Sequence, residues 1–306
     1  MVTILGAGGA VSNGLVKLLT ERKDAFRLVS RRAHPDPAAA EVVAADLTNA
    51  EQAKKAVAGS SVVFLLVGLA YDKRVWAEMW PRIMNNTIEA CKQAGTRLVF
   101  FDNVYMYGRV QGAMTEETPF NPCSKKGEIR ARIATRLMEE WKSGNLTAMI
   151  ARSADFYGPG AKTGIANAMV FEPLSKGDKA MCLVNDSLPH SYTYTPDAAR
   201  ALVTLATHED AWNQTWHLPT SEPVLTGREF IGCAALALNV EPKHQVLRPW
   251  MVKTFGLFNK TIGEVGEMLY QNDSPYLFNS SKYARRFGFV GTPYAEGIRA
   301  TASAYR

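Results

Sequence analysis

The glycine-rich segment near the N-terminus constrains the fold more than any other part of the sequence. An apolar run at residues 2–5 leads directly into residues 6–14, which hold four glycines and then resume the spacing of a helix. This order predicts a strand, a tight turn and a helix. Glycine suits such a turn because a Cβ would hinder both the tight backbone and the close approach of a diphosphate. The N–H groups at the helix N-terminus would bind that anion.

Candidate cofactor contacts follow the first, second and fourth predicted strands. The second strand ends at Ser30, Arg31 and Arg32, with two arginines and no acid where a dinucleotide fold meets the adenosine ribose. An arginine there suits a 2′-phosphate, whereas an acid would suit a bare 2′-hydroxyl. We therefore expect NADP as the cofactor, with NADPH preferred over NADH. The expected contacts in these segments are Gly6, Gly8, Gly9, Ala10, Val11, Ser30, Arg31, Arg32, Val67 and Gly68.

Composition excludes several classes of protein. The net charge of +6 is moderate and basic residues never exceed two in a row, so we expect no nucleic-acid partner. The four cysteines form no C-x-x-C pair and no metal-binding spacing, which indicates reduced thiols, a cytoplasmic protein and no metal site. A strand at residue 2 leaves no room for a signal peptide, and the longest apolar run, residues 62–70, is too short to span a bilayer. We therefore expect no membrane partner.

Apolar runs and helical segments alternate through the first half of the chain. This alternation predicts an α/β fold with a doubly wound parallel sheet, the Rossmann fold. The expected strands are residues 2–5, 26–29, 42–45, 61–67, 97–101 and 146–151, and the expected helices are residues 49–58, 81–94 and 126–141.

The rhythm changes near residue 160, and this change indicates two domains. We expect residues 1–155 to form an NAD(P)-binding Rossmann domain. Residues 156–306 should form a smaller, mostly helical lobe that binds a small-molecule substrate. The two domains are partly interleaved, because a helix and a strand within residues of about 190–220 could return to the first domain.

Three motifs follow one another along the chain. They are Gly6-x-x-Gly9-x-x-Ser12, Asp46-Leu47, and the run R-S-A-D-F-Y-G-P-G at residues 152–160. In this order and spacing they resemble the extended short-chain dehydrogenase/reductases, the NAD(P)-dependent epimerase/dehydratase family, with a serine at the third glycine of its G-x-x-G-x-x-G motif. The resemblance covers essentially the whole chain, and it implies that Asp46, Leu47 and Tyr157 contact the cofactor.

The serine, tyrosine and lysine that the family uses for catalysis are altered here. By position, Asn103 replaces the serine, Lys126 the tyrosine and Arg130 the lysine, and no Tyr-x-x-x-Lys occurs anywhere. In the family the lysine lowers the pKa of the tyrosine phenol and holds the nicotinamide ribose. The resemblance thus implies that Arg130 holds the cofactor ribose or phosphate, unless it is simply exposed on a charged helix face.

Three residues are candidates for catalysis: Asn103, Tyr105 and Lys126. Asn103 could donate its amide to a carbonyl, or it could be only a turn residue at a strand end. Tyr105 could supply a phenolic proton, and as long as the segment is extended its side chain points to the same side as Asn103. Lys126 could act as an acid if it were buried, but its place beside Lys125 at a helix start favours a solvated charge.

Two further features bear on the substrate. His190 takes the place of an arginine that grips the substrate diphosphate in the sugar-nucleotide enzymes that the chain resembles, which argues against a sugar nucleotide. Tyr71, Trp76 and Trp80 could line an apolar pocket, or they could belong to a packed loop.

These observations favour an NADP(H)-binding oxidoreductase of atypical short-chain type that acts on a small or apolar carbonyl or alcohol. Two alternatives stay open: a sugar-nucleotide epimerase or dehydratase, and a catalytically inactive sensor of the NADPH/NADP+ ratio. The sensor would need the glycine turn but no catalytic acid. The expected helix at residues 126–141 has one apolar stripe, and this stripe packs against the sheet. A dimer contact on this helix would therefore have to be polar, so we expect a monomer or a weak homodimer.

Overall fold

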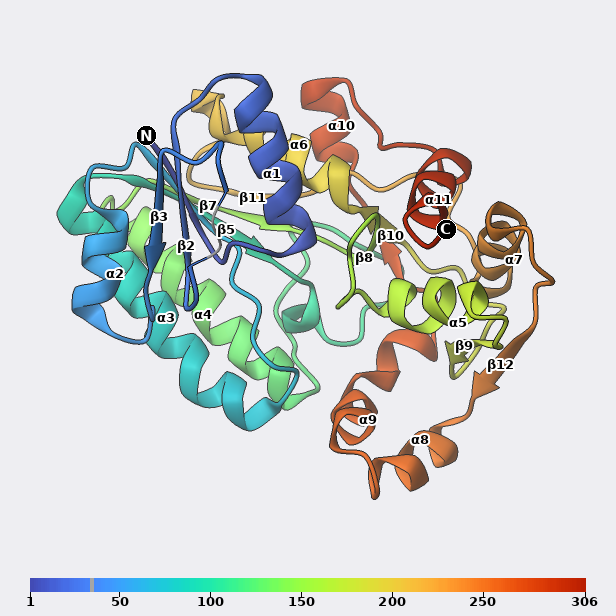
Figure 1. The fold of residues 1–306 in the computed structure, drawn as a ribbon. Helices are drawn as coiled ribbons and strands as arrows, with labels where there is room; N and C mark the ends of the chain where they lie inside the picture. Colours follow the sequence, from blue (N-terminus) through green and yellow to red (C-terminus); the bar gives the residue numbers. More distant parts are fainter. Residues whose placement is uncertain (34–35) are drawn as a thin grey trace. The chain divides into compact units, whose positions relative to one another are not determined.

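In the computed structural model, which describes residues 1–33 and 36–306, seven strands form one sheet in the order β11-β7-β5-β4-β1-β2-β3 (Figure 1). The pairs that join β7, β5, β4, β1, β2 and β3 are all parallel. The strand order reverses between β1 and β4, which makes this point the topological switch of a Rossmann fold. The strands are β1 (Val2–Leu5), β2 (Phe26–Ser30), β3 (Glu41–Ala44), β4 (Val62–Leu65), β5 (Arg97–Asp102), β7 (Ala148–Arg152) and β11 (Thr215–His217).

Helices cover both faces of this sheet. Figure 1 shows α2, α3 and α4 on one face and α1 and α6 on the other. The central strands are therefore buried on both sides, and every residue of β4 and β7 is buried. The predicted doubly wound parallel sheet is confirmed. The helices are α1 (Ala10–Glu21), α2 (Ala50–Val57), α3 (Lys73–Ala94), α4 (Lys125–Lys142) and α6 (Thr195–Ala206).

Helix α3 is longer than the sequence pattern predicts. It begins at Lys73 rather than at Pro81, and the Asp72 side chain caps it by accepting a hydrogen bond from the Arg74 N–H. Pro81 therefore lies inside the helix, not in its first turn. Trp76 and Trp80 lie one turn apart on α3 and are both buried, so they are not part of a loop.

The chain separates into two units, each with its own contacts. The first contains Met1–Met106, Lys126–Arg152 and Ala198–Trp216, and the second contains Tyr107–Lys125, Ser153–Asp197 and His217–Arg306. Residues 107–125 thus cluster with the second unit. The expected functional division at residues 155 and 156 stays a prediction.

Short strand pairs and helices build the second unit. Its pairs are β10 with β8, β12 with β9 and β13 with β6. These strands are β6 (Ala113–Met114), β8 (Asp155–Tyr157), β9 (Ala180–Leu183), β10 (Tyr192–Tyr194), β12 (His244–Leu247) and β13 (Leu277–Phe278). The helices are α5 (Glu172–Ser175), α7 (Gly227–Leu238), α8 (Pro249–Gly256), α9 (Lys260–Val265), α10 (Ser281–Phe287) and α11 (Tyr294–Ser303). Short 3-10 segments occur at Tyr105–Tyr107, Glu209–Ala211 and Gly266–Asn272, and Asn167–Phe171 is π-helical.

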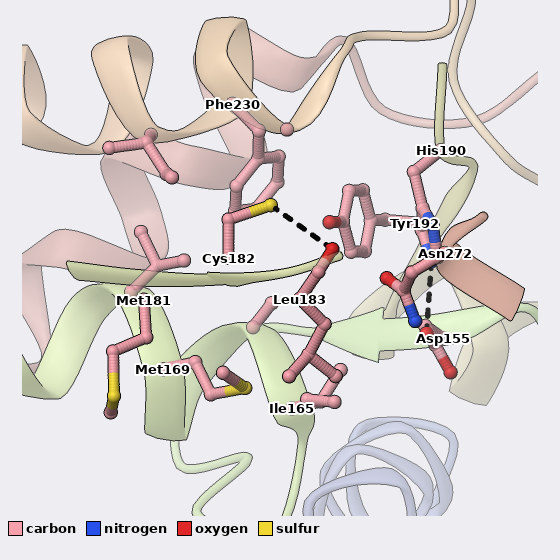
Figure 2. Close-up of a pocket in the computed structure, with 14 residues that line it drawn as sticks. Asp155, Ile165, Met169, Met181, Cys182, Leu183, His190, Tyr192, Phe230 and Asn272 are labelled. Atoms are coloured by element: carbon pink, nitrogen blue, oxygen red, sulfur yellow. Dashed lines mark hydrogen bonds and ion pairs between the residues drawn. The ribbon is translucent and has the colours of Figure 1, made fainter. Parts of the chain in front are cut away.

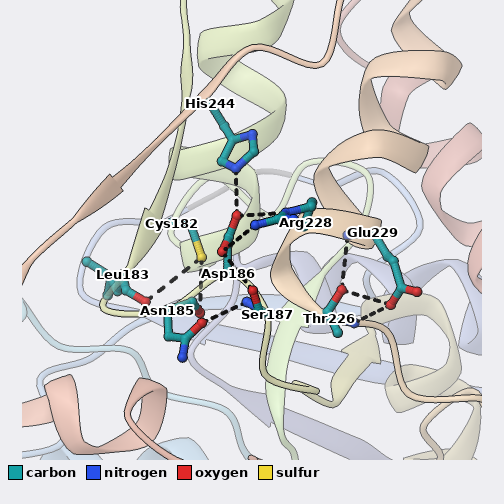
Figure 3. A network of polar contacts seen from close by, with 9 residues as sticks. All are labelled: Cys182, Leu183, Asn185, Asp186, Ser187, Thr226, Arg228, Glu229 and His244. Carbon is teal, nitrogen blue, oxygen red and sulfur yellow. Dashed lines mark hydrogen bonds and ion pairs between the residues drawn. The ribbon is translucent and has the colours of Figure 1, made fainter.

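A buried carboxylate, Asp186, links three elements of the second unit (Figure 3). It follows β9 and accepts hydrogen bonds from Arg228 of α7 at 3.0 and 3.2 Å and from the His244 ring of β12 at 2.9 Å. The bonds from Arg228, with that from His244, hold the pKa of Asp186 well below its usual range. Asp186 is therefore ionised at neutral pH and stabilises the fold there.

We expect Asp186→Asn to lower the free energy of unfolding by about 1–3 kcal/mol at pH 7, because charged hydrogen bonds are lost. The folded-state pKa of Asp186 lies below its unfolded value, so its contribution is present above pH of about 4 and is lost as the pH falls further. Urea unfolding at pH 7 and near pH 2 should show a smaller deficit of the variant in acid. Asp178→Asn, at an exposed position, is the control. An equal deficit at both pH values would contradict this role.

Candidate functional site

The glycine turn after β1 has two kinds of glycine. Gly6 and Gly8 adopt positive φ angles of 103° and 96°. A Cβ on Gly6 would lie 2.7 Å from the backbone of Leu66 and Val67, and the Gly6 N–H donates to the Val29 carbonyl at 2.9 Å. Gly6 is therefore required by the fold itself.

Gly9 has no such structural need. Its φ of −84° is open to any residue, and a Cβ there would have only the Ser12 hydroxyl nearby, at 3.8 Å. Gly9 is the N-cap of α1, and no side chain caps this helix end. The first N–H groups of α1, including those of Ala10 and Val11, have no partner within the helix. A bare glycine at an uncapped helix N-terminus is the arrangement that admits an anion.

Ser12 replaces the third glycine of the motif and is buried, donating its hydroxyl hydrogen to the Gly9 carbonyl at 2.8 Å. The close helix packing that the third glycine allows elsewhere is provided by Gly14. A Cβ on Gly14 would lie 2.8 Å from the Ala199 Cβ of α6.

The end of β2 presents two exposed arginines, Arg31 and Arg32. The Ser30 hydroxyl donates to the Arg32 carbonyl and so shapes this turn. The predicted acidic dipeptide follows β3. Asp46 accepts from the N–H and hydroxyl of Thr48, and these bonds lower its pKa.

Leu47 is buried, and its carbonyl accepts from the Asn86 amide at 2.9 Å. Beyond β4, Val67 is half-buried and Gly68 is exposed, with no atom within 4 Å of a Cβ built on it. The first unit thus brings the glycine turn and the ends of β2, β3 and β4 to one edge of its sheet, since the strands are parallel. Their contacts with a cofactor stay predictions.

The segment after β5 differs from the expected geometry. The strand ends at Asp102, and the Asn103 side chain accepts a hydrogen bond from the Tyr105 N–H at 3.1 Å. Tyr105 then begins a 3-10 helix. The segment is therefore not extended, because the amide closes a turn, and the condition under which Asn103 and Tyr105 would project to one side is not met.

Lys126 is not a surface charge. Its side chain is fully buried in the first turn of α4, and its ammonium lies 4.4 Å from the centroid of the Tyr71 ring. The expectation of a solvated lysine is wrong because the aromatic ring, half-buried itself, covers the cation.

Arg130, one turn further along α4, is also buried. Its guanidinium lies 3.2 Å from the Asp102 carboxylate and packs 4.1 Å over the Trp80 ring and 4.8 Å over the Trp76 ring. The alternative of an exposed helix face is therefore wrong. The predicted contact of Arg130 with the cofactor stays a prediction, since this side chain has a structural partner in Asp102.

A second arginine completes this buried ionic cluster. Arg152, at the end of β7, is the register neighbour of Asp102 on β5, and its Nε lies 3.8 Å from the carboxylate. Burial raises the pKa of Asp102 while Arg130 and Arg152 oppose that shift, and burial lowers the pKa of Arg130 while Asp102 opposes it. Sequence reasoning missed Asp102, although an acid at the end of an apolar strand was a visible signal.

Tyr105 joins the cluster through its ring. It stacks on Trp76 with 6.2 Å between ring centroids and 13° between planes. The charge interaction of Arg130 with Tyr105 acts to raise the pKa of Arg130. The structure therefore brings Tyr105, Lys126 and Arg130 to one group of aromatic rings, as the sequence did not predict.

Tyr157 lies in the core of the second unit. It is 1% exposed and contacts the rings of Tyr192, Tyr194, Phe230 and Tyr294. Burial raises its pKa far above the usual range. Its contact with a cofactor stays a prediction that this packing does not favour.

The second unit holds a pocket (Figure 2). Within it the His190 ring lies 2.9 Å from the Asp155 carboxylate and stacks on Tyr276, with 4.2 Å between ring centroids. The side chain of Asn272 adds a further polar group. The other walls are chiefly apolar and sulfur-bearing: Ile165, Ala166, Met169, Val170, Met181, Cys182, Leu183, Tyr192, Phe230 and Ile231.

Two features are absent from residues 1–33 and 36–306. These residues contain no cluster of three or more His, Cys, Asp or Glu side chains that could hold a metal ion. None of their helices is long and apolar enough to cross a membrane.

The two kinds of glycine predict different variants. Gly6→Ala should lower the free energy of unfolding by about 1–3 kcal/mol, because φ is positive and the Cβ meets backbone. Gly9→Ala should leave it within about 0.5 kcal/mol but weaken NADPH binding at least about tenfold, since a methyl group would stand where the diphosphate approaches. Urea unfolding and NADPH fluorescence titration measure both. Unchanged NADPH affinity in Gly9→Ala would contradict the anion site at this turn.

Solved structures of other proteins share this architecture. No curated protein matches the sequence. Among solved structures, a double mutant of DesIV, a dTDP-glucose 4,6-dehydratase from Streptomyces venezuelae, is similar with a TM-score of 0.81 and 16% identity over 100% of this chain and 97% of its own. UDP-glucose 4-epimerase from Thermus thermophilus has a TM-score of 0.80 and 19% identity over 100% and 98%. The Thermotoga maritima UDP-glucose 4-epimerase has a TM-score of 0.82 and 16% identity over 100% and 98%.

These TM-scores establish a shared fold. The sequence itself also matches a family model, over residues 2–217. This range includes the glycine turn, the whole parallel sheet and the altered catalytic positions. The chain belongs to the NAD dependent epimerase/dehydratase family.

Proposed function

We propose that this chain binds a nicotinamide dinucleotide and is an oxidoreductase that acts on a small or apolar carbonyl or alcohol. The observation that carries the proposal is Gly9, a glycine without a structural need at the uncapped N-terminus of α1, beside the switch point of the sheet. Family membership and neighbours solved with NAD support the same cofactor class. When bound, the cofactor supplies hydride transfer. The chain orients the substrate and gives a proton to the carbonyl oxygen.

The part of the site that would hold the adenosine ribose supports a preference for NADPH over NADH. Arg31 and Arg32 are exposed where β2 ends, and no acid is present to bind a bare 2′-hydroxyl. Arginine also matches a phosphate in charge and in hydrogen-bond geometry.

The buried cations Lys126 and Arg130 and the rings of Tyr71, Trp76, Trp80 and Tyr105 form a cation–aromatic cluster in the first unit. This cluster supports a proton donor that differs from the family's tyrosine. In the family a cation lies close to the catalytic phenol, and here Arg130 interacts with the Tyr105 phenol although the two residues come from different segments. Tyr105 would give the proton to the carbonyl oxygen, and the buried Lys126 would set the local charge. Asn103 positions this segment by closing the turn before Tyr105.

The pocket of the second unit supports an apolar substrate. His190 takes the place of the arginine that grips the diphosphate in sugar-nucleotide enzymes, and its ring contacts Asp155 and Tyr276. The Asp155 carboxylate would repel a diphosphate, while the methionine and aromatic walls would bind an apolar group.

A second candidate is a sugar-nucleotide epimerase or dehydratase. The neighbours are such enzymes, and taken alone the comparisons fit this candidate better than the first. The substitutions at Asn103, Lys126, Arg130 and His190 favour the first.

Removing one arginine should separate the two cofactors. We expect Arg31→Ala to weaken NADPH binding at least about tenfold and to leave NADH binding unchanged, because only NADPH carries the 2′-phosphate. Fluorescence titration of both cofactors measures this, and Arg22→Ala, an exposed arginine paired with Asp24, is the matched control. Equal affinity of the wild-type protein for NADPH and NADH would contradict the preference.

A panel of apolar aldehydes and ketones, with UDP-glucose and dTDP-glucose alongside, tests the substrate class. We expect NADPH-dependent turnover of an apolar carbonyl, lowered by Tyr105→Phe by about 10²–10⁴-fold with little change in NADPH affinity. Lys126→Met should lower it less.

Conversion of a nucleotide sugar would establish the second candidate. Full activity in Tyr105→Phe together with loss in Lys126→Met would make the lysine the proton donor. Absence of turnover throughout, with NADPH bound, would leave the sensor.

A further inference from the structure

The helical hairpin α8–α9 of the second unit exposes large apolar side chains. Trp250 is 69% exposed, Leu257 79% and Phe258 88%. Phe255, on the last turn of α8, is also exposed. Single exposed apolar residues are ordinary, but four within nine residues form a patch of the kind that marks an interaction surface.

The hairpin is held in shape by glycines. A Cβ on Gly256 would lie 2.8 Å from the Cα of Gly263, so α8 and α9 touch backbone to backbone at this point. Val252 is 1% exposed and anchors α8 in the unit. Residues 257–259 therefore form a fixed tip where the hairpin turns, and Figure 1 shows α8 and α9 at one end of the second unit.

The backbone of the tip is internally bonded. The N–H groups of Leu257, Phe258 and Asn259 donate to carbonyls of Thr254 and Phe255 at 3.2, 3.0 and 2.9 Å. An apolar environment would thus meet side chains and not orphaned N–H groups of the turn, which lowers the cost of placing this loop against lipid.

Charge on the surface of the tip is chiefly positive. Residues 242–263 contain four basic residues and no aspartate or glutamate, and the next acid, Glu264 on α9, is buried. Lys243 pairs with Glu241. Arg248 precedes α8, Lys253 lies on α8 and Lys260 begins α9, so these three basic residues flank the exposed aromatic side chains of α8 and of the tip. Tryptophan, phenylalanine and leucine next to lysine and arginine are the composition of segments that lie in the interface of an anionic bilayer.

We infer that the α8–α9 tip docks this protein on the surface of an anionic membrane. Leu257 and Phe258 enter the headgroup region, and Arg248, Lys253 and Lys260 contact lipid phosphates. This inference departs from the expectation of no membrane partner, which rested on the lack of a spanning segment. Docking on a membrane surface needs no spanning helix, so it is compatible with the absence of one from the described residues. A second copy of the chain is a poorer occupant, because a symmetric contact would bring three cations against three.

Vesicle flotation tests this inference with the full chain. We expect binding to vesicles of phosphatidylcholine mixed equally with phosphatidylglycerol and much weaker binding to phosphatidylcholine alone. The double variant Leu257→Ser, Phe258→Ser should lower binding at least about tenfold, because the tip loses its two most exposed apolar side chains. Lys253→Gln with Lys260→Gln should lower binding and weaken its dependence on salt, since Arg248 remains. Leu236→Ser, at an apolar position 82% exposed on α7, should bind as the wild type.

Thermal melting of each variant checks that it is folded. Absence of wild-type binding to anionic vesicles would overturn the inference, as would binding that the tip variants leave unchanged. Sedimentation that shows a dimer lost in the Leu257→Ser, Phe258→Ser variant, without vesicle binding, would assign the patch to a second copy and overturn it too.

Discussion

A single carboxylate, Asp102, holds together the part of the first unit where the chemistry is expected. It lies buried at the end of β5, between Arg152 of the neighbouring strand and Arg130 of α4. Removing one partner of a buried ion pair costs about 3–5 kcal/mol, a large share of the roughly 5–15 kcal/mol that stabilises a typical domain. The end of the sheet and the start of α4 are therefore fixed relative to each other, and so are the side chains attached to them.

This cluster occupies the positions at which the family carries its catalytic tyrosine and lysine. Arg130 occupies the position of the family's lysine, but its guanidinium is bound to Asp102 and enclosed by Trp76 and Trp80. The phenol that it influences comes from Tyr105, on the segment after β5, and the position of the family's tyrosine is taken by the buried Lys126. In the proposed site the cation and the phenol come from different elements, so a search for Tyr-x-x-x-Lys in the sequence does not detect this pair.

The parts of the fold that depend on local patterns were predictable. Uninterrupted apolar runs indicated the strands β4 and β5, and clustered glycines indicated the first turn, because these signals need no knowledge of distant residues. The start of α3 was missed because Pro81 suggests a helix start, whereas the cap is Asp72. The burial of Lys126 was missed because it depends on Tyr71, which is far away in the sequence. The turn at Asn103 followed a known preference of asparagine, yet its effect on the direction of Tyr105 required coordinates.

A crystal structure of the protein with NADPH is the most direct measurement of the central claim, that the cation–aromatic cluster of the first unit is the reaction site. We expect the nicotinamide ring to lie beside the Tyr105 phenol and the Lys126 ammonium, with the diphosphate at Gly9 and the 2′-phosphate against Arg31. A nicotinamide ring remote from both Tyr105 and Lys126, with other polar side chains facing its C4 atom, would contradict this claim.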